Sequence, residues 1–246
     1  MSNLIMSDDP LRPVVLSEET KAQLNGVSTA TLAGQLQRRG IRSAFMGGLK
    51  PSHPEQRMLG YARTLRYVAL REDIAPKLQA GGVNAQRRAV EGLKPEDVLV
   101  IEARGEAHAA TIGDIFVMRS KALGAAGIVS DGGLRDTPAI YGIDIPVYHL
   151  SSHAATLGRL HMPMDTDGGI TCAGCFVQPG DIIVGDGEGA IVVPAALVEE
   201  VARDAANQEE EETFAVERVA QGESTVGLFP LSKDRRPEFE AWKAAR

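Results

Sequence analysis

The sequence predicts a single mixed α/β domain in which helices cover a sheet. Short apolar runs alternate with helical patterns in the middle of the chain. Two further apolar runs flank a Gly/Asp-rich turn, and a long helical pattern follows them. We find no internal repeat, and 246 residues are enough for one large domain. These observations favour an α/β sandwich with one core over two separate domains.

The first part of the chain predicts an arm, two capped helices and a loop. Residues 1–16 show no periodicity and are expected to be irregular. Ser17, followed by two glutamates, is typical of a helix start. Ser28 predicts the cap of a second helix that ends at Gly40. Glycines and prolines in 41–57 predict a loop.

The middle of the chain alternates the two kinds of element. Apolar or alternating runs predict strands there, and helical periodicity predicts helices. In chain order we expect a strand at 60–70, a helix at 83–91, a strand at 98–101, a helix at 114–123, and strands at 127–130 and 145–148.

The last part predicts a loop, a hairpin, a long helix and a tail. Residues 151–169 are rich in Ser, Gly, His and Asp, so we expect a loop there. Apolar runs on both sides of 185–189 predict a hairpin, in which Asp181 and Asp186 form turns. Residues 195–221 predict one helix, and prolines predict an irregular tail beyond it. The nearby histidines are expected in loops or interfaces: His149, His153 and His161.

Composition restricts the classes of function. The net charge of −7 disfavours nonspecific nucleic-acid binding, because that binding needs clustered Lys and Arg. No apolar run reaches the about 18 residues that a membrane-spanning helix needs. The first residues also lack the pattern of a signal peptide. We therefore expect a cytoplasmic protein that binds neither nucleic acid nor membrane.

Cys172 and Cys175 form a C-x-x-C motif with three open interpretations. The motif follows an expected strand and enters a turn, whereas a redox pair should open a helix. Zinc would need two further ligands at a standard spacing, which the nearby histidines do not provide. Structural cysteines are therefore the favoured interpretation, with metal and redox roles as alternatives.

The segment 113–136 carries the main functional signal. A Gly-Asp turn opens an apolar helix, and a Gly-rich turn after the next strand ends in Arg135 and Asp136. A carboxylate beside a fixed cation can hold a hard metal ion next to an anionic substrate. Two simpler interpretations remain open: Asp114 as a helix N-cap, and Arg135–Asp136 as a surface ion pair.

With these motifs the chain resembles the RraA-like family. That family includes class II 4-hydroxy-4-methyl-2-oxoglutarate/4-carboxy-4-hydroxy-2-oxoadipate aldolases, which also decarboxylate oxaloacetate. The resemblance implies a ββα sandwich of the swivelling-domain type. The catalytic domain would span 28–221, between an N-terminal arm and helix at 1–27 and a C-terminal arm at 222–246. The matching segments are STATLAGQL at 28–36, GYARTL at 60–65, IGDIFVMRSKALGAAGIVSDGGLRD at 112–136 and PGDIIVGDGEGAIVVP at 179–194.

The resemblance also implies a role for each candidate residue. Asp136 would bind Mg²⁺ or Mn²⁺, and Asp114 would hold a water on that metal and act in catalysis. Arg135 would bind the substrate and stabilise the developing enolate. The substrate carboxylate would lie at the start of the helix, against Gly113, Ile115 and Phe116.

On this basis we expect a metal-dependent carbon–carbon lyase. It would cleave a 2-oxo acid to pyruvate by a retro-aldol reaction, decarboxylate oxaloacetate, or do both. The family further implies a homotrimer or homohexamer with sites between subunits. One acidic residue of a neighbouring subunit's C-terminal helix, within 209–212, would reach each site.

Two alternatives to this activity remain. The aldolase branch usually has an acidic residue three positions after the Asp of the Arg-Asp pair, where this chain has Ala139. The substrate of a lyase or hydratase could then be a 2-oxo acid derived from a sugar acid. Some family members are instead non-enzymatic proteins that bind and inhibit ribonuclease E.

Overall fold

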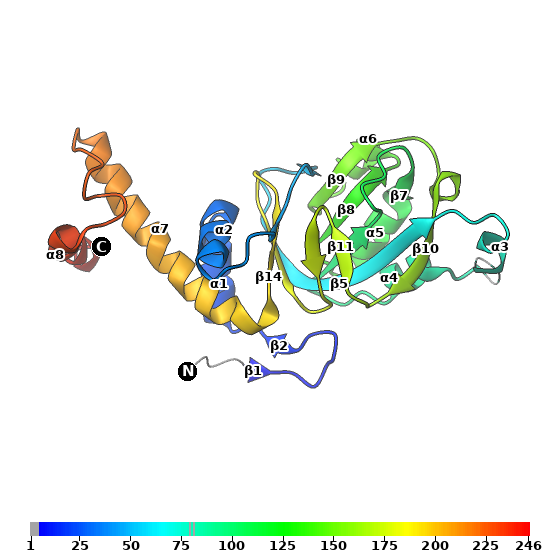
Figure 1. Ribbon diagram of the computed structural model, residues 1–246, viewed down its shortest axis with the longest axis horizontal. Helices are drawn as coiled ribbons and strands as arrows, with labels where there is room; N and C mark the ends of the chain where they lie inside the picture. The colour runs from blue at the N-terminus through cyan, green and yellow to red at the C-terminus, as the bar shows by residue number, and fades with distance from the viewer. Residues whose placement is uncertain (1–4, 79, 81) are drawn as a thin grey trace.

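The computed structural model describes residues 5–78, 80 and 82–246, and its centre is a curled sheet flanked by helices (Figure 1). This confirms the predicted mixed α/β class. Within the described ranges, ten strands join in this sheet, with β10 (His161–Thr166) beside β5 and β7 (Ala110–Ile112) beside β8. The other strands, in spatial order, are β3 (Phe45–Met46), β14 (Ala190–Val193), β13 (Ile182–Gly185), β5 (Met58–Ala69), β6 (Asp97–Glu102), β8 (Gly127–Leu134), β9 (Val147–Ser152) and β4 (Lys50–Pro51).

The middle of the sheet is parallel. β5, β6, β8 and β9 are successive parallel neighbours, and β7 also runs parallel to β8. Each residue of Val98–Ile101 is fully buried, as expected for a strand covered on both faces. Because β7 and β8 run in the same direction, the residues that follow them meet at one edge of the sheet.

Helices cover the sheet in two groups. Ser17 and Ser28 cap α1 (Glu18–Gly26) and α2 (Thr29–Arg38), as predicted, and these helices pack with α7 (Val198–Ala220) against β13 and β14. The second group, α4 (Ala85–Glu91), α5 (Asp114–Ala122) and α6 (Thr137–Ile140), lies over the parallel strands.

The remaining elements are short. They are β1 (Ile5–Met6), β2 (Val14–Val15), α3 (Ala75–Leu78), η1 (Leu157–Arg159), β11 (Ile170–Cys172), β12 (Cys175–Val177), η2 (Ala195–Leu197), η3 (Lys233–Arg235) and α8 (Arg236–Ala244).

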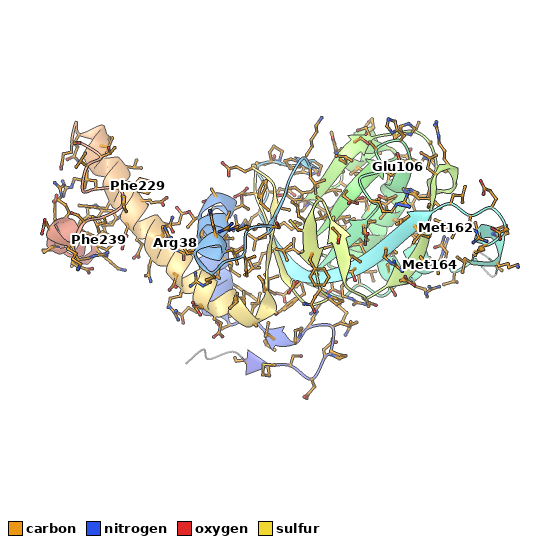
Figure 2. The ribbon with its side chains drawn as sticks, in the orientation of Figure 1. Arg38, Glu106, Met162, Met164, Phe229 and Phe239 are labelled. Atoms are coloured by element: carbon orange, nitrogen blue, oxygen red, sulfur yellow. The ribbon has the colours of Figure 1, made fainter. Side chains whose placement is uncertain are left out.

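The chain beyond the sheet is less irregular than predicted. α7 extends away from the sheet, and α8 lies beside its far end (Figure 1). Phe214 of α7 packs against Phe239 and Trp242 of α8, with ring centroids 5.7 and 5.6 Å apart. Figure 2 shows Phe239 and Phe229 at the opposite end of the molecule from Glu106 and Met162. None of the helices described in the structure is both long and apolar enough to cross a bilayer.

Three loop-like predictions are wrong in part. The arm at 1–16 and the loop at 41–57 contain short strands, although residues 1–4 lie outside the described ranges. The expected loop at 151–169 contains η1 and β10, and β10 pairs antiparallel with β5. His149 lies in β9 and His161 lies in β10, so both are buried strand residues instead of loop residues.

The C-x-x-C motif forms the tight turn between β11 and β12. Cys172 and Cys175 are both buried and free, and they are opposite each other across the turn. Burial raises the pKa of the Cys175 thiol to about 11, which disfavours the thiolate that redox or metal chemistry would need. This environment supports the structural interpretation of the two cysteines.

Candidate active site

Asp114 begins α5 directly after β7. The N-cap position is taken by Gly113, which has no side chain to act as a cap, so the interpretation of Asp114 as the N-cap is wrong. Asp114 Oδ1 instead accepts a hydrogen bond of 2.8 Å from the backbone N–H of Ile115. Among the described atoms, the N–H of Phe116 has no such partner. The helix start therefore offers a carboxylate and a free amide side by side.

Arg135 and Asp136 follow β8 at the same edge of the sheet. The Arg135 N–H donates to the carbonyl of Ile112 in β7, at 3.0 Å, which fixes the two strand ends together. Asp136 has a left-handed backbone conformation (φ 58°), and its side chain makes no capping bond to α6. Arg135 Nε and Asp136 Oδ2 are 3.9 Å apart, and both side chains remain over 40% exposed (43% and 42%). The Asp136 carboxylate is therefore available to a ligand.

A cavity of about 350 Å³ brings all these residues together. Its volume suits a small organic acid. Every site residue expected from the sequence lines it, together with seven residues that the sequence reasoning did not identify. The expected residues are Gly113, Asp114, Ile115, Phe116, Arg135 and Asp136, and the others are Gln86, Arg87, Ala110, Thr111, Ile112, Thr156 and Leu157.

Buried polar side chains hold β7 in place at the cavity. The Thr111 carbonyl accepts hydrogen bonds from the Tyr67 hydroxyl at 2.6 Å and from Gln86 Nε2 at 2.5 Å. His161 Nε2 lies 3.1 Å from the carbonyl of Ala110, and its ring is 4.7 Å from that of Tyr67. Burial lowers the pKa of His161, so its imidazole is neutral and donates Nε2–H to that carbonyl. Hydrogen bonds from Tyr67, Gln86 and His161 thus fix β7, the strand that leads into the cavity.

The donor set suits a hard divalent cation. Asp114 and Asp136 provide carboxylate oxygens, which Mg²⁺ and Mn²⁺ prefer. A Cβ at Gly113 would lie only 3.0 Å from Asp136 Oδ2, so the absence of a side chain leaves room around that oxygen. In the described part of the chain, no group of three or more His, Cys, Asp or Glu side chains could hold a metal. A cation here would have few protein ligands, as Mg²⁺ sites often do.

The acidic residues at 209–212 have partners within their own chain. Glu209 Oε1 accepts hydrogen bonds from Ser28 and Thr31. Glu210 pairs with Lys243 and Glu211 pairs with Arg236. Glu212 accepts a hydrogen bond from Gln208. Contribution of one of them to a neighbouring subunit's site remains a prediction.

The fold is mixed α/β, and a cavity lined by two arginines and two aspartates lies where parallel strands end. The chain belongs to the RraA-like family, described as Aldolase/RraA, whose profile matches residues 29–192. A protein of Halalkalibacterium halodurans, provisionally named 4-hydroxy-4-methyl-2-oxoglutarate aldolase, is 31% identical over 162 residues. That match covers 64% of this chain and 69% of the relative.

Solved structures agree with this assignment. Streptomyces coelicolor RraAS2, titled an unusual member of the RNase ES inhibitor RraA protein family, is 32% identical with a TM-score of 0.73. The match covers 83% of this chain and 97% of RraAS2. An uncharacterised protein of Pseudomonas syringae pv. tomato shares the fold at 22% identity, with a TM-score of 0.74 and coverage of 87% and 98%.

Proposed function

We propose that the protein is a divalent-metal-dependent lyase that cleaves a 4-hydroxy-2-oxo acid to pyruvate by a retro-aldol reaction, and that it also decarboxylates oxaloacetate. The observation that carries the proposal is the meeting of Asp114, Arg135 and Asp136 in one cavity at the start of α5. The aldolase name of the Halalkalibacterium relative supports the same reaction class.

The reaction needs a stabilised enolate. The C3–C4 bond breaks, and its electron pair passes to C2 and its oxygen to form the enolate of pyruvate. The C4 hydroxyl loses its proton as C4 becomes a carbonyl carbon. The enolate then takes up one proton at C3 and becomes pyruvate. The site must therefore accept a hydroxyl proton and stabilise negative charge at the C2 oxygen.

The residues of the cavity suit these tasks. Asp114 would accept the hydroxyl proton, and the guanidinium of Arg135 would stabilise the charge on the C2 oxygen. The Phe116 amide and the positive end of the α5 dipole would bind the substrate's C1 carboxylate. A divalent cation held by Asp136 directly and by Asp114 through water would polarise the C2 keto group as a Lewis acid.

The test is pyruvate release from 4-hydroxy-4-methyl-2-oxoglutarate, which yields two pyruvate molecules. We expect turnover with Mg²⁺ or Mn²⁺ and its loss with EDTA. Removing the charge-stabilising donor in Arg135→Ala should lower kcat about 10²- to 10³-fold. Arg119→Ala is the matched control, because Arg119 pairs with Glu91 outside the cavity. Turnover that survives EDTA, or is unchanged in Arg135→Ala, would contradict the mechanism.

Oxaloacetate requires a stricter comparison. Free divalent cations polarise its keto group without a protein, so its decay must be measured against the same metal concentration in buffer. A sugar-acid-derived 2-oxo acid should also be tested as a substrate, because this chain has Ala139 where the aldolase branch usually has an acidic residue. Faster cleavage of that acid would reassign the substrate and leave the roles of the three charged residues intact.

The name of the Streptomyces relative favours a second candidate, a protein-binding regulator that inhibits a ribonuclease of the E type. The two candidates predict different outcomes. A regulator should bind the ribonuclease in a pull-down and show no metal-dependent turnover of any 2-oxo acid. The lyase should show turnover that depends on Arg135.

A further inference from the structure

The cavity contains a second guanidinium that the reaction described above does not use. Asn84 caps α4 by accepting a hydrogen bond from the N–H of Arg87 at 2.9 Å, which places Arg87 in the first turn of that helix. Arg87 lines the same cavity as Arg135. Its guanidinium carbon lies 5.7 Å from the ring centroid of Phe116, at the start of α5. Arg87 thus lies on the wall that α4 contributes.

Arg87 has no salt-bridge partner in the part of the chain that the structure describes. Glu91 lies four residues further on, the usual position of an ion-pair partner on a helix. Glu91 Oε2 instead accepts hydrogen bonds from Arg119 of α5, at 2.8 and 3.1 Å. Within the described residues, no carboxylate forms a salt bridge with Arg87, although its charge, after the hydrogen bonds from Arg119, contributes to the lowered pKa of the Glu91 carboxyl. The neighbouring Arg88 donates to the Val83 carbonyl and does not line the cavity.

The charges of the cavity favour a substrate with two negative groups. The charged residues that line it are two arginines, Arg87 and Arg135, and two aspartates, Asp114 and Asp136. A divalent cation on the two aspartates would offset their charge. The two guanidinium groups would then remain for anionic groups of the substrate. A planar guanidinium pairs well with a carboxylate, through two parallel hydrogen bonds.

We propose that Arg87 is a specificity-determining residue that binds a second carboxylate, at the end of the substrate remote from the 2-oxo acid group. This inference rests on the proposed lyase function. It favours a 4-hydroxy-2-oxo diacid over a sugar-acid-derived substrate whose far end is an uncharged polyol. A site built to pair a charged group discriminates strongly against an analogue that lacks it.

The same residue favours aldol cleavage over decarboxylation. In a retro-aldol reaction the far carboxylate keeps its charge, so Arg87 can hold it through the transition state. In β-decarboxylation the carboxylate leaves as neutral CO₂, and a guanidinium bound to it would stabilise the ground state instead. Interactions accelerate a step only when they are stronger in its transition state.

The test uses two substrates that differ only at the far end. 4-Hydroxy-2-oxoglutarate yields pyruvate and glyoxylate, whereas 4-hydroxy-2-oxopentanoate, with a methyl group in place of the carboxylate, yields pyruvate and acetaldehyde. We expect kcat/KM to favour the diacid by about ten- to a hundredfold, the range of a charge-assisted hydrogen bond. Arg87→Ala should reduce that ratio to near one, and the matched control Arg88→Ala should preserve it.

A binding measurement separates this inference from the lyase function. Titration calorimetry with Mn²⁺ would compare 2-oxoglutarate with 2-oxopentanoate, a pair that also differs only at the far end and cannot undergo the aldol step. Tighter binding of the diacid that disappears in Arg87→Ala, without cleavage of either hydroxy acid, would support the carboxylate site and overturn the lyase function. An equal preference in the wild type and Arg87→Ala would overturn the role of Arg87, even in an active enzyme.

Discussion

Two pairs of carboxylates in this molecule have opposite surroundings. In the turn between β13 and β14, Asp186 accepts hydrogen bonds from the Thr29 N–H and hydroxyl, at 2.7 and 2.8 Å. Glu209 accepts three more around the start of α2, from the Ser28 N–H and hydroxyl at 2.9 Å and from the Thr31 hydroxyl at 2.7 Å. These side chains join β13, α7 and the start of α2.

The carboxylates of the cavity have almost no such donors. Asp114 accepts one backbone hydrogen bond, and Asp136 faces Arg135 at 3.9 Å, beyond hydrogen-bonding distance. A carboxylate that fills its acceptor positions with protein donors stabilises the fold. One that leaves them open can bind a cation or take a proton. The structural acids and the acids of the proposed site therefore differ in the number of hydrogen-bond donors that each one has.

Asp136→Asn should give the largest effect and leave stability nearly unchanged. Asparagine tolerates the left-handed backbone of Asp136, so the fold is kept while the charge is removed. We expect cleavage of 4-hydroxy-4-methyl-2-oxoglutarate to fall at least about a hundredfold, as for a disrupted metal site. Urea unfolding should change by less than about 0.5 kcal/mol. A large loss of stability would place Asp136 with the structural carboxylates.

Glu209→Gln should show the reverse behaviour. Replacing the charged acceptor of three hydrogen bonds should lower the free energy of unfolding by about 1–3 kcal/mol. Glu210→Gln, on the same helix, removes only an exposed ion pair with Lys243 and should cost less than about 1 kcal/mol. Equal unfolding curves for the two variants would contradict the comparison.

The effect of Glu209 should depend on pH. Burial raises the pKa of this carboxyl, but the hydrogen bonds from Ser28 and Thr31 outweigh burial and hold it below the usual 4.5. A carboxyl whose pKa is lower in the folded state stabilises the fold fully above its unfolded pKa, and this contribution is lost as the pH falls through the folded pKa. The difference in stability between wild type and Glu209→Gln should therefore be full at pH 7 and shrink below about pH 4.5.

Tyr67→Phe should give the smallest effect. The variant removes one of the two hydrogen bonds to the Thr111 carbonyl and leaves that of Gln86. We expect unfolding to become about 1 kcal/mol easier, and kcat/KM to fall less than about tenfold. Thermal unfolding and steady-state kinetics would check both. A fall in kcat/KM of more than about tenfold, with a loss of stability of only about 1 kcal/mol, would show that the position of β7 directly limits catalysis.

The sequence predicts those residues of the candidate site that lie close together in the chain. The Gly-Asp turn and the Arg-Asp pair stand at the ends of neighbouring elements, where their patterns are visible. Gln86 and Arg87 went unnoticed because only the fold brings α4 to the start of α5. The bond between Ser28 and Glu209 likewise spans 181 residues, a separation at which no local pattern specifies a contact.

Two of the elements that the sequence did not predict, β10 and α8, differ in how visible they were. β10 (HMPMDT) has little apolar periodicity, and its pairing with the distant strand β5 has no local signal, so it could not be predicted locally. α8 did have a signal. Pro237 lies in its first turn, where proline is tolerated, and Phe239 and Trp242 are three residues apart on one face. The prolines predict a tail, although Pro237 lies in the first turn of a helix.

The bare backbone at Gly113 makes the proposed chemistry easy to lose in evolution. Its φ of −127° suits any residue, so alanine there would fold without backbone strain. The added methyl group would nevertheless press on the Asp136 carboxylate, which lies 3.0 Å from its position. One base change in the gene would thus yield a folded homologue in which the carboxylate of the proposed metal site has to shift by a few tenths of an ångström. Such a homologue would be free to acquire another role on the same scaffold.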